Sequence, residues 1–208
     1  MYNNKHDLEL FKKQFIREEL GITDEYGSIF TFIDFGNVNK KLEINIALLK
    51  DFSYYFSLST RFYYGHDPAN IGSMGFLRKT RDIFGKSKVF TKPLQKVRHH
   101  LKDNERETNT RNLFHDTDGD YILLPKCNFD VEISVDAIKL SEHYDTFCLF
   151  SGDADFVYLN SYLRNKGKKI ILIKGGHITD NLRKSADKVI NAQNIKKYIT
   201  QTKQKPGG

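Results

Sequence analysis

The chain has 208 residues, of which 39% are hydrophobic and 13% aromatic, and its net charge is +7. This length and composition predict one globular domain with a full core, and the chain contains no run of about 18 apolar residues that would span a membrane. Residues 1–7 are polar and lack the apolar stretch of a secretory signal. Cys127 and Cys148 are isolated thiols, so no disulfide framework is expected and a reducing cytoplasm is the default location.

Apolar residues at helical spacing predict an N-terminal helix over residues 5–20, which Gly21 is placed to end. After it, strand and helix patterns alternate along the chain. The predicted elements are strand 29–34, helix 44–52, strand 58–64, helix 71–84, strand 88–91, helix 130–143, strand 146–150, helix 156–165, strand 169–173, helix 179–185, edge strand 188–190 and helix 195–199.

This alternation predicts a three-layer α/β fold with a central, mostly parallel sheet. We expect an N-terminal helical extension over 1–22, one α/β domain over 23–200 and a flexible tail over 201–208. Residues 99–121 interrupt the pattern because they are polar and contain few apolar residues. A structureless segment of that length inside a compact domain is typical of a functional or mobile loop.

The apolar side of the predicted helix 130–143 is assigned to Val131, Val135 and Ile138, with Ile133 beside them. Asp136 lies between Val135 and Ala137 in the middle of this helix, where Asp has poor helix propensity. An acidic residue in such a position indicates a functional role.

Two predicted apolar strands end in acidic residues. The sequence IDFGN contains Asp34 and Asn37, and the sequence SGDADF contains Asp153 and Asp155. Open α/β sheets hold their sites at the carboxyl ends of the strands, so these side chains are expected to share one pocket. Asn37, a neutral donor and acceptor close to Asp34, is suited to orienting a water molecule or a phosphate.

An acidic pocket of this kind predicts a divalent metal ion. Two carboxylates 4 Å apart repel by about 4 kcal/mol at an effective dielectric constant near 20, so a cluster requires protonation or a cation. Oxygen ligands favour Mg²⁺ or Mn²⁺ over zinc. The candidate ligands are Asp34, Asp130, Asp136, Asp153 and Asp155.

Each acid also has a structural alternative. Asp153, Asp155 or Asp130 alone is equally suited to capping the helix that follows it. Asp34 is harder to explain in this way, because a charge at the end of a buried strand needs a partner. The joint pattern therefore favours a site over independent caps.

Basic residues around the pocket suit a polyanion that is held by its phosphates. The residues expected to contact nucleic acid are Lys92, Lys96, Arg98, Lys126 and Ser151. The alternative is a solvated loop, because residues 86–111 contain few aromatic side chains for base stacking.

The motifs IDFGN, FDVEISVDA and SGDADF resemble NYN domains of the PIN-like nuclease superfamily, specifically the bacterial LabA-like group, over about residues 29–195. The resemblance implies a Rossmann-like sheet whose first and fourth strands are neighbours, and Mg²⁺- or Mn²⁺-dependent ribonuclease chemistry. Two positions depart from the group: Lys126 lies four residues before Asp130 where a spacing of three is common, and Tyr158 stands where Pro is common. The residues that match the three motifs are Asp34, Asn37, Asp130, Asp136, Asp153 and Asp155.

We therefore predict a metal-dependent ribonuclease, with endonucleolytic cleavage of RNA as the expected mode. PIN-like domains often pair, so a homodimer is compatible with the resemblance. One alternative is a non-catalytic RNA-binding or regulatory module that keeps the same pocket. A phosphatase of the haloacid dehalogenase type would need a second Asp two residues after Asp34, where this chain has Gly36.

Overall fold

The computed structural model describes residues 5–39, 42–106 and 111–201. Six strands form one parallel sheet in the order β3-β2-β1-β7-β8-β9. Numbered along the chain within this sheet, the order is 3-2-1-4-5-6, which is the doubly wound arrangement. The predicted α/β fold and the contact between its first and fourth strands are confirmed. The strands are β1 (Ile29–Asp34), β2 (Ser59–His66), β3 (Val89–Pro93), β7 (Thr146–Phe150), β8 (Lys169–Lys174) and β9 (Lys188–Asn191).

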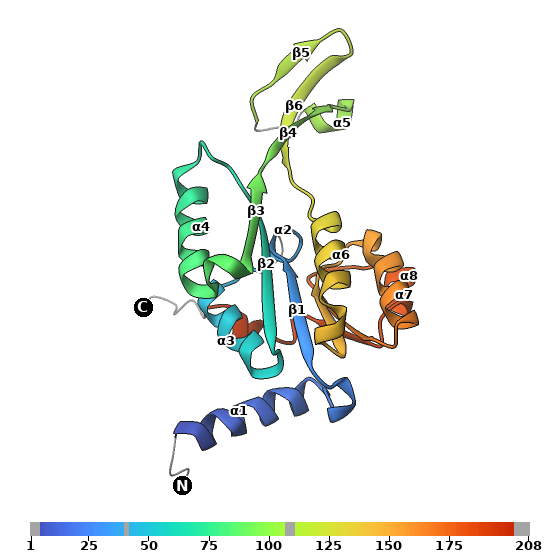
Figure 1. The fold of residues 1–208 in the computed structure, drawn as a ribbon. Coiled ribbons are helices and arrows are strands. Elements are labelled where there is room, and N and C mark those ends of the chain that lie inside the picture. The colour runs from blue at the N-terminus through green and yellow to red at the C-terminus, as the bar shows by residue number, and fades with distance from the viewer. Residues whose placement is uncertain (1–4, 40–41, 107–110, 202–208) are drawn as a thin grey trace, which may run out of the picture.

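Helices cover both faces of this sheet (Figure 1). One face carries α1 (Lys5–Glu19), α3 (Ile46–Phe56), α4 (Ile71–Phe84) and α9 (Lys196–Ile199), and the other carries α6 (Asp130–Lys139), α7 (Val157–Asn165) and α8 (Asp180–Lys184). Shorter turns are α2 (Phe35–Val38) and the 3-10 helices η1 (Asp24–Tyr26), η3 (Lys86–Lys88), η4 (Ser141–His143) and η5 (Ala154–Phe156). No helix within the described ranges is long and apolar enough to cross a membrane.

Side chains of β1 alternate between the two hydrophobic cores. Ile29 and Ile33 are buried against the α3 and α4 face, whereas Phe32 is buried against the α6 and α7 face. Because successive side chains of a strand point to opposite faces, Asp34 lies on the same side as Phe32. The sheet therefore directs Asp34 toward the layer that contains α6.

The buried face of α6 differs from the prediction. Ile133 and Ala137 are fully buried, whereas Val131 is 73% exposed and Val135 and Ile138 are also exposed. The assignment of Val131, Val135 and Ile138 to the core is wrong because the close approach of α6 to the sheet is made by a small residue, Ala137, which carries little hydrophobic signal.

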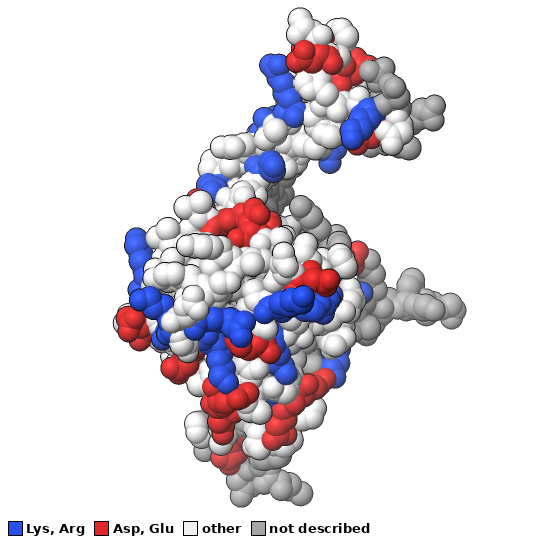
Figure 2. Space-filling model, turned by 90° about the vertical axis from the view of Figure 1, so that its right-hand side faces the viewer, with Lys and Arg blue, Asp and Glu red and all other residues white. Residues whose placement is uncertain are grey.

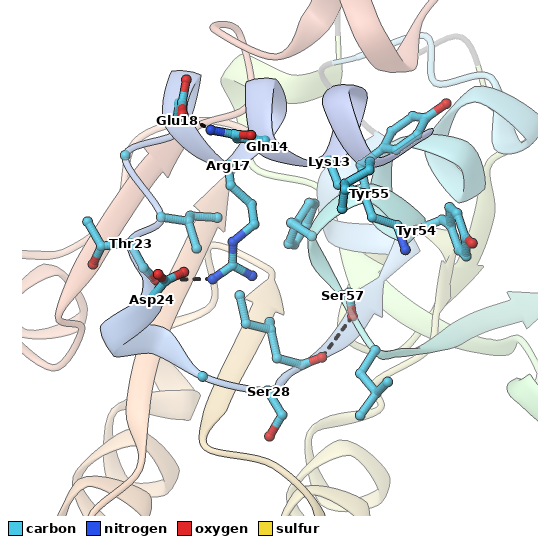
Figure 3. A pocket seen from close by; sticks show the side chains of 17 residues that line it. Lys13, Gln14, Arg17, Glu18, Thr23, Asp24, Ser28, Tyr54, Tyr55 and Ser57 are labelled. Carbon is cyan, nitrogen blue, oxygen red and sulfur yellow. Dashed lines mark hydrogen bonds between the residues drawn. The ribbon is translucent and has the colours of Figure 1, made fainter. Parts of the chain in front are cut away.

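The N-terminal helix α1 packs against α3, and its Ile16 joins the core of the main domain. It ends at Glu19, and the turn that follows places Gly21 at a φ of +59°, a backbone conformation that favours glycine. A cavity of about 910 Å³ lies between α1, the start of β1 and the end of α3. Figure 3 shows Arg17 in this cavity, where its guanidinium donates to the Thr23 carbonyl at 3.1 Å. The cavity is at the amino-terminal edge of the sheet, opposite the acidic residues.

The segment between β3 and α6 forms an arm that stands out from the body of the molecule (Figure 1). It is a three-stranded antiparallel sheet in the order β4-β6-β5, with β4 (Gln95–His100), β5 (Phe114–Asp116) and β6 (Gly119–Lys126), and it includes α5 (Asp103–Arg106). The expectation of a structureless loop over 99–121 is therefore wrong for its described residues. β4 and β5 are largely exposed, and β6 is half-buried with Ile122 as its one buried residue, so these strands lack the regular apolar alternation of a sheet with one face on a core.

Candidate functional site

The predicted acidic residues lie at the carboxyl edge of the sheet, between β1 and β7. This is the point where the strand order reverses, which is where doubly wound folds hold their ligands. Ser151, directly after β7, donates a hydrogen bond from Oγ to Asp34 Oδ2 at 3.2 Å. Asn37 Oδ1 accepts from the Gly152 N–H at 2.9 Å. These two contacts fasten the end of β1 and the start of α2 to the loop after β7.

The turn that follows β7 carries the next two acids. The Asp153 N–H donates to Ser151 Oγ at 3.2 Å, and the Asp155 N–H donates to Asp153 Oδ1 at 3.1 Å. Asp153 is the N-cap of η5, so the capping alternative accounts for one oxygen of this carboxylate. The cap also fixes the orientation of the Asp153 carboxylate.

Asp130 begins α6 on the same side of the sheet. The Asn128 side chain accepts a hydrogen bond from the Asp130 N–H at 2.7 Å, in an Asx turn that leads into this helix. Carboxylate oxygens of Asp130, Asp153 and Asp155 lie within 4.8 Å of one another. Burial raises the pKa of Asp130, and the negative charges of Asp153 and Asp155 raise it further. Three carboxylates whose oxygens converge and whose charges repel one another have the chemistry of a ligand set for Mg²⁺ or Mn²⁺.

Asp34 lies beside this group and is more deeply buried. Burial raises the pKa of Asp34 to about 6, against the opposing effect of hydrogen bonds from Ser151 and from the Asn37 N–H. The charges of Asp130 and Asp153 raise this pKa further. The charged form of Asp34 is therefore costly unless a cation is nearby.

Asp34, Asp130 and Asp153 face a cavity of about 270 Å³ between the sheet edge and the base of the arm. Its wall is formed by the end of β2, the base of the arm and the start of α6. The residues that line it include Asp34, Asn37, Tyr64, Gly65, Leu94, Pro125, Lys126, Asn128, Asp130 and Asp153. On the face seen in Figure 2, Asp and Glu side chains gather where the arm joins the body.

The structure corrects the prediction for Asp136, which is not part of this group. Its Oδ2 accepts hydrogen bonds from Arg61 Nη1 and from the Tyr63 hydroxyl, both at 2.7 Å. Asp136 is six residues after Asp130, a rise of about 9 Å along the helix, so it faces the middle of β2 rather than the sheet edge. Its position among apolar neighbours is explained by this ion pair.

Two of the predicted nucleic-acid contacts have other partners. Ser151 is fully buried, and its hydroxyl is already shared between Asp34 and the Asp153 N–H, so it positions the acids rather than contacting a ligand. Lys92 Nζ forms an ion pair with Glu132 Oε1 at 2.5 Å. Lys126 lines the acidic cavity, whereas Lys96 and Arg98 lie on the arm.

The sequence reasoning omitted Asn128, which holds the first residue of α6 in place. Its signal is present in the sequence, because an Asn side chain commonly accepts a hydrogen bond from the backbone N–H two residues later in an Asx turn. A second group that could hold a cation is formed on the arm by His100, Asp116 and Asp118. The oxygens of Asp116 already accept from Arg98, His100 and the Asp118 N–H, so the arm group is explained without an ion.

Comparison with known proteins agrees with this architecture. A curated relative, the low amplitude and bright protein LabA of Synechococcus elongatus, is 34% identical over 90 residues, which cover 43% of this chain and 48% of that protein. The alignment thus spans about half the length of that relative. A crystal structure of a protein of unknown function from Vibrio parahaemolyticus superposes with a TM-score of 0.55 at 19% identity, covering 81% of this chain and 94% of the other, and shows the same fold. The family model described as the NYN domain matches residues 28–195, and the chain therefore belongs to the NYN domain family.

Proposed function

We propose that this protein is a Mg²⁺- or Mn²⁺-dependent ribonuclease that cleaves RNA endonucleolytically. The observation that carries the proposal is the convergence of the Asp130, Asp153 and Asp155 carboxylates within 4.8 Å, with Asp34 facing the same cavity. The family supports it, since NYN domains are associated with RNA and with nuclease-like chemistry.

Asp130, Asp153 and Asp155 would hold the ion, and Asp34 would complete the acidic wall on the β1 side. A divalent ion supplies Lewis acidity, which lowers the pKa of a water molecule and stabilises the attacking and leaving oxygens of a phosphodiester. Ser151 keeps Asp34 and the Asp153 turn in register through its hydroxyl. Asn37 lines the cavity and would position the scissile phosphate.

Lys126 lies in the cavity wall and would contact a phosphate next to the scissile one. Lys96 lies further along the arm, where its ammonium group would hold the same strand by its backbone. Neither contact reads a base, so the acidic site itself would cut with little sequence preference.

The test is cleavage of a mixture of structured and single-stranded RNA in Mn²⁺, Mg²⁺ or EDTA. The Asp153→Asn variant keeps an oxygen for the Asp155 N–H but removes one charge, so we expect a folded protein whose cleavage falls by about 100-fold or more. Asp82→Asn, which changes an exposed carboxylate on α4, is the matched control and should cut normally. Wild-type protein that cuts equally well in EDTA would contradict the proposal.

Metal binding is measured separately, by the loss of the free Mn²⁺ electron paramagnetic resonance signal on titration with protein. Wild-type and Asp82→Asn protein should bind Mn²⁺, and Asp153→Asn should bind it more weakly by about 10-fold or more. Equal Mn²⁺ affinity of all three proteins would show that these carboxylates do not hold the ion.

The second candidate is a non-catalytic RNA-binding module. The observation that favours it is the cap made by Asp153, which gives this carboxylate a structural role without any metal. Such a module would bind RNA equally in EDTA and Mn²⁺ and would never shorten it. The cleavage experiment separates the two functions directly.

A further inference from the structure

One face of the arm carries an aromatic platform that no single segment of the sequence contains. In the antiparallel pairing, His100 lies opposite Tyr121 on β6, and Phe114 lies opposite Tyr121 from the other side. The Phe114 and Tyr121 rings are stacked, with centroids 5.5 Å apart and planes 22° apart. The His100 and Tyr121 ring centroids are 5.6 Å apart. Three rings from three strands thus form one continuous surface.

Arg98 extends this surface with its guanidinium plane. Its guanidinium carbon lies 5.0 Å from the centre of the Tyr121 ring, and Nη1 donates to Asp116 Oδ2 at 3.1 Å. The Arg98 side chain is still 62% exposed, so the guanidinium is held over the ring while remaining open to solvent. Phe114 is 41% exposed, although a large apolar ring gains by burial. The Phe114 ring and the Arg98 guanidinium are therefore both accessible to a flat ligand.

The same face leads to the acidic cavity. Side chains two residues apart on a strand share a face, so Tyr121, Leu123 and Pro125 lie on one side of β6, and Pro125 lines the cavity. Lys96 lies opposite Pro125 on this side, between the platform and the acids. The distance along β6 from Tyr121 to Pro125 is about 14 Å. A strand bound along this face would reach the acids without crossing the sheet.

We propose that this face of the arm binds single-stranded RNA, with unpaired bases stacked on Phe114 and on the Arg98 guanidinium and the backbone phosphates near Lys96. The inference rests on the proposed function, for which it names the substrate class: single strands rather than duplexes. Bases in a duplex are already stacked on each other and cannot lie on the platform, whereas splayed bases of a single strand stack readily on aromatic and guanidinium planes.

The test measures fluorescence anisotropy of a labelled RNA single strand of about 12 nucleotides in EDTA, so that binding is observed without cutting. Phe114→Ala and Arg98→Ala should each weaken binding by about 5-fold or more, because each removes a flat group on which a base stacks. Phe114→Trp should keep the affinity, since it preserves the stacking plane. Val97→Ala is the matched control, because Val97 is exposed on the opposite face of β4, and it should bind normally.

Two results would overturn the inference. The first is a finding about RNA: either Phe114→Ala and Arg98→Ala bind the single strand as tightly as the wild type does, or the wild type binds a duplex at least as tightly as the single strand. The other is a change in the molar mass of Phe114→Ala by light scattering with no change in RNA affinity, which would make a second copy of the chain the occupant of this face.

The experiments distinguish failure of the proposal for the arm from failure of the proposed nuclease function. Asp153→Asn should bind the single strand like the wild type while it fails to cut, because the platform does not involve the acids. If the wild type never cuts but Phe114→Ala loses binding, the nuclease proposal fails and the arm proposal holds. If Phe114→Ala binds and cuts like the wild type, the arm proposal fails alone.

Discussion

Asn37 Oδ1 accepts a hydrogen bond from the Gly152 N–H at 2.9 Å, and this contact joins α2 to the loop after β7, 115 residues away in the chain. Removing the acceptor leaves the Gly152 N–H without its partner beside the acidic cavity. Asn37→Ala should therefore lower the free energy of unfolding by about 1–2 kcal/mol and reduce cleavage by more than the loss of folded protein explains. Chemical denaturation and cleavage per folded molecule measure the two effects. Asn39→Ala, which removes an acceptor from Ile44 outside the site, should reduce stability alone.

The pH dependence of stability should depend on Asp34. Its pKa is raised from 3.8 to about 6, so between about pH 4 and pH 6 the folded protein binds more protons than the unfolded chain. The free energy of unfolding should fall as the pH rises through this window, and the full penalty should be present above it. Asp34→Asn should be more stable than the wild type at about pH 7, by up to about 3 kcal/mol, and should lose most of this advantage below about pH 4.

This experiment is done by urea unfolding without divalent ions, with Asp82→Asn as the control variant. Asp130 also has a raised pKa, so part of the pH dependence should remain in Asp34→Asn. An identical pH profile for Asp34→Asn and the wild type would show that Asp34 is not buried in the way described.

Asp136 should be a structural residue. Asp136→Asn weakens its contacts with Arg61 and Tyr63, and we expect a loss of about 1–3 kcal/mol in the free energy of unfolding. Cleavage per folded molecule and Mn²⁺ affinity should stay within about 2-fold of the wild type, because Asp136 is about 9 Å along α6 from Asp130. Asp130→Asn should show the opposite pattern, with activity lost and the fold retained. A loss of Mn²⁺ binding in Asp136→Asn would contradict this prediction and show that Asp136 contributes to the metal site.

The base of the arm should not tolerate a side chain at residue 65. A Cβ on Gly65 would lie 2.6 Å from Cys127 Cβ and 2.8 Å from Leu94 Cδ2. Gly65→Ala should lower the free energy of unfolding by about 1–3 kcal/mol and increase hydrogen exchange at the arm base. Gly75→Ala is the matched control, because a Cβ there has no neighbour within 4 Å, and in the middle of α4 it should stabilise the protein by about 0.5–1 kcal/mol. Equal stability of the two variants would contradict the described packing of the arm.

The sequence alone predicted the sheet and most of the acidic group, because each depends on local patterns. Apolar strands that end in Asp34 and before Asp153 mark the sheet edge, and the parallel alternation brings those ends together. The place of Asp136 was not predictable in this way. Its partner Arg61 is 75 residues away, and helical spacing alone does not show which strand a helix face will meet.

The arm was not predictable for a different physical reason. Among its strand residues only Ile122 is buried, so neither hydrophobic alternation nor helical spacing marks these strands. The aromatic platform is not visible in the sequence, because Phe114 and Tyr121 lie outside the basic segment 86–111 and His100 is 21 residues from Tyr121. Only the pairing of β4, β5 and β6 places the three rings together.

The two ends of the arm meet at one point. Leu94, where the chain leaves the body, and Cys127, where it returns, both lie within 3 Å of the same position above Gly65. The arm is consequently an insertion with adjacent ends, which can be lengthened, shortened or exchanged without rerouting a strand of the central sheet or moving a carboxylate. Chains that share this acidic edge can therefore differ in the size and sequence of the inserted arm, while the acidic residues at the sheet edge keep their arrangement.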